Sequence, residues 1–138
     1  MLAMEESQDT LTAHVLAVDD DPSVRKVICN YLGDNDIRVT ALASGRDIAD
    51  VMAREVIDLL VLDWRLPGED GLELIRKVRA LEAERGGRIP ALALTAYSGR
   101  TNRETAQAAG FDQQVSKPVV PAELVAQAAL LAGTRARP

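Results

Sequence analysis

Residue types on which much protein chemistry depends are scarce in this chain of 138 residues. Its one cysteine, Cys29, excludes an internal disulfide and a cysteine-based metal cluster. Its one histidine, His14, lacks the second imidazole that a histidine metal site or a nucleophile–base pair would need. We therefore expect Cys29 to be a core residue of a helix and His14 to be a strand-end residue.

Long apolar runs and an excess of positive charge are also missing. No stretch approaches the roughly 20 apolar residues of a membrane span, and residues 1–9 lack the apolar core of a signal peptide. We expect a cytoplasmic protein with no membrane partner. The net charge of −5 disfavours direct binding to nucleic acid. The length suits one compact domain.

Strand-like and helix-like segments alternate between a polar tail over residues 1–12 and a short tail over 133–138. Apolar runs predict strands at 14–19, 37–42, 57–62, 89–94 and 112–116. Capping and periodicity predict helices that begin near Pro22, Ser44, Asp70, Gly99 and Pro121. The third of them is expected to reach Arg85 and to end at Gly86-Gly87. Short connections then predict one α/β domain over 13–132, a parallel sheet with helices on both faces.

The fourth predicted helix, 99–109, contains no large apolar side chain. Such a helix buries little surface and is held weakly by tertiary contacts. It is either a solvated surface helix or a mobile element whose position responds to an event elsewhere. The sequence leaves these two interpretations open.

Polar residues close several of the predicted strands. Asp19 and Asp20 follow the first strand, Asp63 the third, Thr95 the fourth and Lys117 the fifth. Ligands of parallel sheets bind outside the carboxyl ends of the strands. We therefore expect these five side chains to form one acidic pocket at that edge of the sheet.

The chemistry of this set indicates phosphoryl transfer. Three carboxylates in one pocket repel one another, so they call for a cation, and an all-oxygen set favours Mg²⁺. Asp63 would be the nucleophile, while the cation, Lys117 and the Thr95 hydroxyl neutralise charge on the phosphoryl oxygens. Two other acids have simpler roles: Asp21 is expected to cap the first helix and Asp70 to serve the start of the third.

Four segments in order resemble the signature of receiver domains of two-component response regulators. They are Val18-Asp19-Asp20-Asp21-Pro22, Leu62-Asp63 through Gly71, Leu94-Thr95-Ala96 and Ser116-Lys117-Pro118. The similarity covers about residues 13–132, with a first half closest to receivers of winged-helix regulators and a second half closest to those of hybrid kinases. It implies a single flavodoxin-like (βα)5 doubly wound domain with strand order 2-1-3-4-5.

The resemblance also implies residue roles. Asp63 would accept a phosphoryl group from a phosphohistidine of a sensor histidine kinase. Asp20 and Asp63 would bind Mg²⁺ directly, Asp19 through water and Arg65 through its carbonyl oxygen. Thr95 and Lys117 would contact the phosphoryl oxygens, and the Lys117-Pro118 peptide bond would be cis. Such a domain is not an enzyme beyond catalysing its own phosphotransfer and dephosphorylation.

The chain departs from the family at the elements that report phosphorylation. Gln114 occupies a position, three before Lys117, where the family has an aromatic switch residue. Large side chains at Arg65 and Tyr97 are expected to overhang the site, and Trp64 adjoins it, so Gln114, Tyr97 and Trp64 are the switch and gating candidates. The last helix lacks the charges through which winged-helix regulators dimerise. A homodimer through its apolar residues competes with burial of those residues in the core.

The sequence is compatible with three functions. The leading one is a phosphorylation-dependent module that switches protein–protein interactions, with a downstream target protein or a histidine phosphotransfer protein as second partner. The alternative is a pseudo-receiver that binds without being phosphorylated, which Gln114 favours and the intact acids oppose. A Mg²⁺-dependent phosphatase would carry a second acid two residues after the nucleophile, where this chain has Arg65.

Overall fold

The apolar runs form a five-stranded parallel sheet in the computed structural model, which describes residues 13–66, 68–96 and 99–136. The order of strands in space is β2-β1-β3-β6-β7. Counted along the chain this is 2-1-3-4-5, which confirms the predicted topology. The strands are β1 (His14–Val18), β2 (Arg38–Leu42), β3 (Leu59–Asp63), β6 (Ala91–Thr95) and β7 (Gln113–Ser116).

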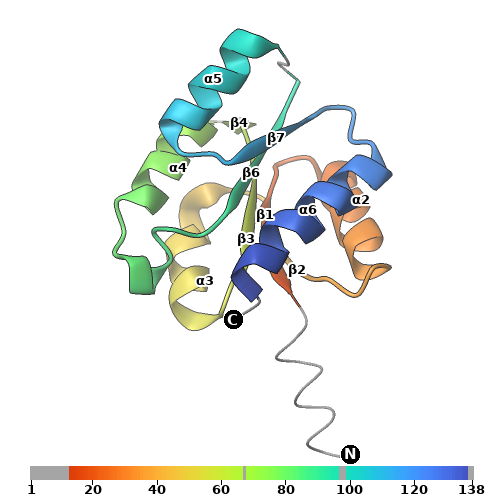
Figure 1. The fold of residues 1–138 in the computed structure, drawn as a ribbon, viewed down its shortest axis with the longest axis horizontal. Helices are drawn as coiled ribbons and strands as arrows, with labels where there is room; N and C mark the ends of the chain where they lie inside the picture. The colour runs from red at the N-terminus through yellow and green to blue at the C-terminus, as the bar shows by residue number, and fades with distance from the viewer. Residues whose placement is uncertain (1–12, 67, 97–98, 137–138) are drawn as a thin grey trace, which may run out of the picture.

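Helices cover both faces of the sheet (Figure 1). α2 and α6 lie on one face, while α3, α4 and α5 lie on the other. Their bounds are α2 (Pro22–Gly33), α3 (Ile48–Arg54), α4 (Gly71–Arg79), α5 (Arg100–Ala109) and α6 (Pro121–Ala136), with 3-10 turns η1 (Gly45–Asp47) and η2 (Ala83–Arg85). The last helix thus extends into the range predicted as a tail.

Alternation along the strands divides the core in two. Val15, Ala17 and Val61 face α2 and α6 and belong to one buried cluster. Leu16 and Leu62 point the other way and pack in a second cluster with residues of α3, α4 and α5. The central strands β1, β3 and β6 are buried on both faces and read as continuous apolar runs, which is why they were predictable from the sequence. On α6, Leu124 and Ala128 are fully buried in the first cluster, so core packing uses them rather than a dimer contact.

The predicted caps are present. Asp21 accepts a hydrogen bond of 2.9 Å from the Ser23 amide at the start of α2, and Asp70 accepts one of 2.9 Å from the Leu72 amide at the start of α4. Each satisfies one of the amides that a helix N-terminus leaves without an intrahelical partner. Both acids therefore have structural roles, as expected.

The prediction that the third helix runs to Arg85 was wrong, because α4 ends at Arg79 and η2 follows separately. Glu82 is extended, with a ψ of 155°, and breaks the helix between them. The Arg79 guanidinium draws the later chain back onto the end of α4 by donating to the carbonyl oxygens of Gly87 and Ile89. This tertiary contact overrides the local helix propensity.

The C-terminal end of helix α5 is tied to α4. It buries Ala106 and Ala109, which contribute little apolar area. Arg79 of α4 donates a hydrogen bond of 2.9 Å to the Gly110 carbonyl oxygen and pairs with Asp112 at 3.2 Å. Its weak packing agrees with the expectation from sequence, and its mobility stays a prediction.

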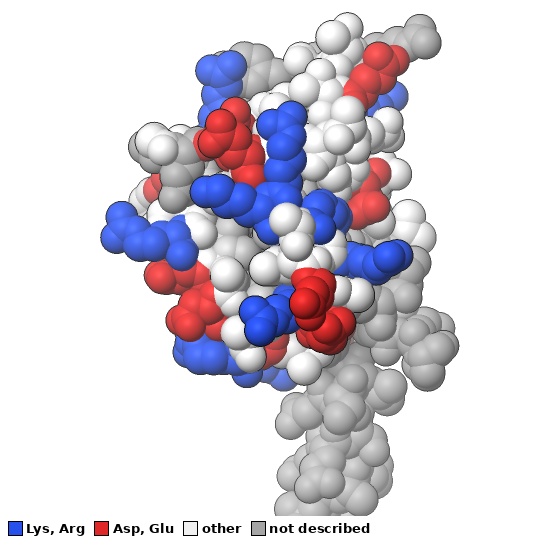
Figure 2. Space-filling model, turned by 90° about the vertical axis from the view of Figure 1, so that its left-hand side faces the viewer, with Lys and Arg blue, Asp and Glu red and all other residues white. Residues whose placement is uncertain are grey.

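The surface on the side of α4 and α5 carries side chains of both charges, with Lys and Arg interspersed with Asp and Glu (Figure 2). Within the described ranges, none of the helices has both the length and the apolar character needed to cross a membrane.

Candidate functional site

The acidic side chains predicted to converge do so at the carboxyl edge of the sheet. Asp19 follows β1 directly, and Asp63 is the last residue of the neighbouring β3. One carboxylate oxygen from each of Asp19, Asp20 and Asp63 lies within 4.8 Å of the others. Asp19 is fully buried and Asp63 is 6% exposed, whereas Asp20 is exposed. Two of the three acids are thus held inside the protein and the third faces solvent.

Lys117 supplies the positive charge of this pocket. Its Nζ lies 2.9 Å from Asp19 Oδ2 and 3.1 Å from Asp63 Oδ2. The Lys117 amide donates a hydrogen bond of 2.8 Å to the carbonyl oxygen of Thr95. The residue Thr95 is buried, with 1% of its surface exposed. The hydrogen bond ties the end of β7 to the end of β6 beside β3. The Lys117-Pro118 bond is cis, as the resemblance implied.

Burial and the neighbouring charges shift the pKa values of Asp63 and Lys117. Burial raises the pKa of Asp63 above its ordinary value, and the nearby Asp19 charge adds to this, while Lys117 and the Arg65 amide oppose it. Burial also opposes the charged form of Lys117, but its contacts with Asp19 and Asp63 outweigh that effect and raise the pKa of the ammonium group. The lysine therefore stays protonated and cancels only part of the carboxylate charge.

A hairpin that the sequence did not predict fixes the backbone around Asp63. β4 (Arg65–Leu66) pairs antiparallel with β5 (Glu69–Asp70) immediately after β3. The Gly71 amide donates a hydrogen bond of 2.7 Å to the Trp64 carbonyl oxygen, and the Arg65 amide donates one of 3.2 Å to Asp63 Oδ1. Each strand is only two residues long, which is too short for a hydrophobic periodicity that would predict it from the sequence.

The candidates for switching and gating have different locations. Gln114 is half-buried on β7 opposite Ala93, and its Oε1 is buried without a hydrogen bond. Trp64 is 7% exposed and packs in the core cluster under α3 and α4, so its indole is a core side chain next to the site. Arg65 is exposed. Tyr97 lies outside the described residues, and the switching roles stay predictions.

The carboxylate set fits a hard divalent cation. Its ligand atoms are all oxygens, and Asp19 Oδ2 is buried without a hydrogen bond and is balanced only by the Lys117 ion pair. A buried carboxylate oxygen with spare acceptor capacity favours a cation nearby. Mg²⁺ prefers a small number of carboxylates and retains water, and the exposed Asp20 leaves one side of the cluster open to solvent.

An apolar hollow of about 540 Å³ adjoins this pocket. It lies between the start of α2 and the segment after β7, and is lined by Ser23, Val24, Val27, Lys117, Pro118 and Val119. Val120, next in the chain, is 51% exposed. The hollow shares Lys117 with the acidic pocket and therefore lies beside Asp63.

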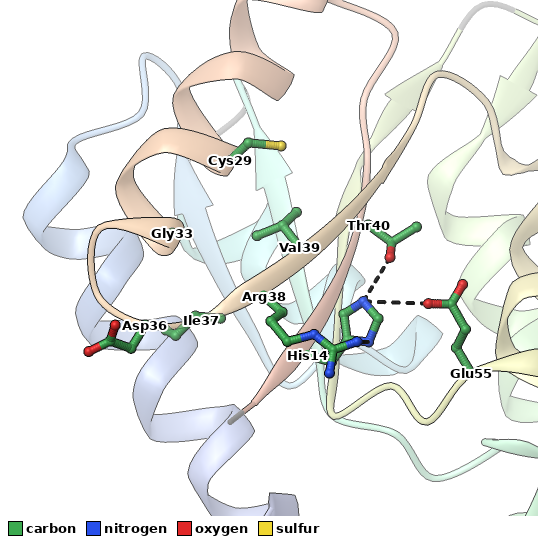
Figure 3. Close-up of a pocket in the computed structure, with 9 residues that line it drawn as sticks. All are labelled: His14, Cys29, Gly33, Asp36, Ile37, Arg38, Val39, Thr40 and Glu55. Atoms are coloured by element: carbon green, nitrogen blue, oxygen red, sulfur yellow. Dashed lines mark hydrogen bonds and ion pairs between the residues drawn. The ribbon is translucent and has the colours of Figure 1, made fainter. Parts of the chain in front are cut away.

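A slightly larger hollow, of about 590 Å³, lies apart from the acidic pocket, at the start of β1 and along β2 (Figure 3). His14 lies in it, 6% exposed, with its Nε2 2.7 Å from Thr40 Oγ1 and its Nδ1 3.5 Å from an Arg38 nitrogen. Arginine can only donate, so Nδ1 accepts and Nε2 carries the proton of a neutral imidazole. Glu55 Oε1 lies 3.8 Å from Nε2, and Asp58 accepts the His14 backbone amide.

This environment predicts a loss of stability in mild acid. Burial and then Arg38 lower the pKa of His14 below its ordinary value of 6.5, with Glu55 and Asp58 opposing them. The unfolded chain therefore binds a proton before the folded chain does, and stability falls as pH drops below 6.5. Each tenfold difference in the proton affinity of His14 between the unfolded and folded states contributes about 1.4 kcal/mol to this loss of stability. Urea unfolding at about pH 8 and about pH 5.5 measures it.

The control for this prediction is His14→Gln, which keeps a polar side chain without a titrating ring. Because His14 is the only histidine, the variant should lose the part of the pH dependence that lies just below neutrality. Equal loss of stability in the native chain and the variant over this range would contradict the assignment of the neutral tautomer.

These observations define a doubly wound parallel α/β domain with a buried carboxylate, two further acids and a lysine at the carboxyl edge of its sheet. Residues 15–129 match the family described as the response regulator receiver domain. The chain therefore belongs to the receiver-domain family of response regulators.

Individual relatives agree with this membership. An uncharacterized 14.6 kDa protein of Leptolyngbya boryana is 40% identical over 111 residues, 80% of this chain and 83% of the relative. The transcriptional regulatory protein GltR of Pseudomonas aeruginosa is 34% identical over 82% of this chain, which spans only 46% of GltR. The solved receiver domain of sensor histidine kinase PA1611, also of P. aeruginosa, is 34% identical with a TM-score of 0.77, covering 88% of this chain and 98% of that one.

Proposed function

We propose that this receiver domain accepts a phosphoryl group on Asp63 from a phosphohistidine of a sensor kinase, in a Mg²⁺-dependent reaction, and thereby changes its protein partners. The observation that carries the proposal is the placement of Lys117 Nζ 3.1 Å from a buried Asp63 carboxylate, with Asp19 and Asp20 beside it. A carboxylate buried for structural reasons alone would not need two further acids beside it.

In the proposed transfer, a carboxylate oxygen of Asp63 attacks phosphorus as the bond from phosphorus to the histidine nitrogen breaks. The nitrogen leaves with the bonding electron pair and takes up a proton, and Asp63 becomes an acyl phosphate. Thr95 ends β6, the neighbour of β3, and Lys117 follows β7 on the other side of β6, with its Nζ 3.1 Å from Asp63 Oδ2. From these positions the Thr95 hydroxyl and Lys117 would bind phosphoryl oxygens. The chain would thus catalyse only its own phosphorylation and dephosphorylation.

Asp19, Asp20, Asp63 and the Arg65 carbonyl oxygen would hold Mg²⁺. When bound, the cation would neutralise negative charge on the phosphoryl oxygens. In support of this assignment, the receiver domain of PA1611 was solved with a magnesium ion coordinated in its active-site cleft. Asp19 and Asp63 would place buried negative charge beside the cation, and the exposed side of the site at Asp20 would admit water ligands.

The partner that delivers or removes the phosphoryl group would dock on the apolar hollow between α2 and the segment after β7. Val24, Val27 and Val119 line it, and Lys117 joins it to the acidic pocket. A histidine of the partner must approach Asp63 within bonding distance, so its surroundings must contact the surface next to Lys117. A sensor kinase or a histidine phosphotransfer protein fits this requirement.

The proposal is tested by incubating the native chain with phosphoramidate, a small donor with a phosphorus–nitrogen bond, in the presence and absence of Mg²⁺. Intact-mass spectrometry should show one added phosphoryl group only with Mg²⁺, and hydroxylamine should remove it because acyl phosphates react with that nucleophile. A chain that remains unmodified while folded would favour the phosphorylation-independent pseudo-receiver. A modification resistant to hydroxylamine would place it on a hydroxyl side chain.

A further inference from the structure

Arg25 lies in the first turns of α2, outside the set of residues that the sequence pattern singled out. Its side chain is half-buried, and its Nη1 donates a hydrogen bond of 2.8 Å to the carbonyl oxygen of Asp19. Its backbone amide donates a second bond, of 3.1 Å, to the carbonyl oxygen of Asp21. One residue of the helix therefore holds two carbonyl groups of the turn that carries the acids.

The turn from Asp19 to Asp21 needs such support because its acids differ in burial. The Asp19 carboxylate is buried, and its Oδ1 accepts a hydrogen bond of 2.9 Å from the Asp21 amide. The exposed Asp20 side chain is not fixed by packing, so its direction depends on the backbone that carries it. The carbonyl group of Asp19 belongs to the peptide unit that enters Asp20. Fixing that carbonyl group fixes the point from which Asp20 reaches toward Asp63.

We propose that Arg25 is a positioning residue for the cation site, holding the Asp19–Asp20 peptide so that the three carboxylates converge before Mg²⁺ binds. This role rests on the proposed function. A site whose ligands are already placed loses less conformational freedom on binding, and its affinity rises accordingly. Partners that orient metal ligands through hydrogen bonds contribute about 10- to 100-fold in affinity.

A purely electrostatic effect of Arg25 would have the opposite sign. Its guanidinium group brings a positive charge behind the acids, and that charge repels Mg²⁺. Removing the side chain would then tighten cation binding, whereas removing a positioning hydrogen bond would weaken it. The direction of the change in Mg²⁺ affinity therefore separates the two effects.

The test is isothermal titration calorimetry of Mg²⁺ with the native chain, Arg25→Met, Arg25→Lys and the control Lys26→Met. Methionine keeps length and apolar contact but cannot donate, while lysine keeps the charge and one donor. We expect Arg25→Met to bind Mg²⁺ about 10-fold or more weakly, Arg25→Lys to recover part of the loss, and Lys26→Met, which removes an exposed cation from the same helix, to match the native chain.

Fluorescence of Trp64, next to Asp63, provides a second Mg²⁺ titration. Thermal unfolding without Mg²⁺ shows whether each variant is folded at the temperature of the titrations. Native-like or tighter Mg²⁺ binding by folded Arg25→Met would overturn the positioning role alone, and so would equal weakening by Arg25→Met and Lys26→Met. Absence of Mg²⁺ binding by the native chain would overturn the proposed function and this role together.

Discussion

Asp63→Asn is expected to abolish phosphorylation without destabilising the fold. The amide has nearly the shape of the carboxylate but lacks the nucleophilic oxygen, so no acyl phosphate can form. We expect no phosphoryl group on the variant under conditions that modify the native chain fully. Intact-mass spectrometry after incubation with phosphoramidate and Mg²⁺ measures this loss.

The effect of Asp63→Asn on stability follows from the pKa of Asp63. Burial raises that pKa above the ordinary value of 3.8, so the ionised carboxylate opposes folding at neutral pH. The raised pKa stabilises the folded state in full below pH 3.8, where Asp63 is protonated. This stabilisation is lost as the pH rises through the higher pKa of the folded state. A neutral asparagine removes the cost, while Lys117 keeps its ion pair with Asp19. The variant should therefore melt at or above the native temperature in the absence of Mg²⁺.

Asp58→Asn is the matched control. Asp58 is also buried, at 8% exposed, but it lies before β3 at the opposite end of the sheet, where it accepts the His14 amide. Its substitution removes one acid without touching the acidic pocket, so phosphorylation should match that of the native chain. Phosphorylation of Asp63→Asn, or equal loss in both variants, would show that Asp63 is not the acceptor.

The sequence predicted the fold and the acids of the site for one physical reason. Strands buried on both faces must be apolar throughout, so a carboxylate at the end of such a run marks the point where the strand emerges. Asp19 and Asp63 could be found in this way, and the caps at Asp21 and Asp70 followed from local helix chemistry. The apolar runs and the helix caps depend on residues close together in the sequence, so they can be recognised without knowledge of tertiary contacts.

What the sequence could not predict depends on contacts between distant segments. Arg79 ends α4 early because carbonyl oxygens beyond η2 fold back to meet its guanidinium group. Arg25 is read as an ordinary polar residue of an amphipathic helix until its hydrogen bond to Asp19 is seen. Trp64 adjoins Asp63 in sequence, yet its side chain packs in the core with residues of α3 and α4, which lie elsewhere in the chain.

Gly71 is such a hidden part of the site, and Gly71→Ala is expected to be strongly destabilising. A Cβ atom at this position would lie 2.3 Å from the Asp63 carbonyl oxygen and 2.6 Å from that of Trp64. Both neighbours are backbone atoms at the end of β3, so no side chain can rotate away. Overpacking of this kind costs about 1–3 kcal/mol. Alanine is otherwise favoured over glycine in a helix, so the clash must reverse the sign of the usual effect.

The same clash should also move Asp63. Relief requires either the start of α4 or the end of β3 to shift, and the hydrogen bond from the Gly71 amide to Trp64 joins the two. We therefore expect Gly71→Ala to lower the free energy of unfolding in urea and to weaken Mg²⁺ binding together. Gly33→Ala is the control, because a Cβ at Gly33 meets no atom within 4 Å at the exposed end of α2. Gly33→Ala should stabilise the chain slightly. Native-like stability and Mg²⁺ binding of Gly71→Ala would refute the close approach between α4 and β3.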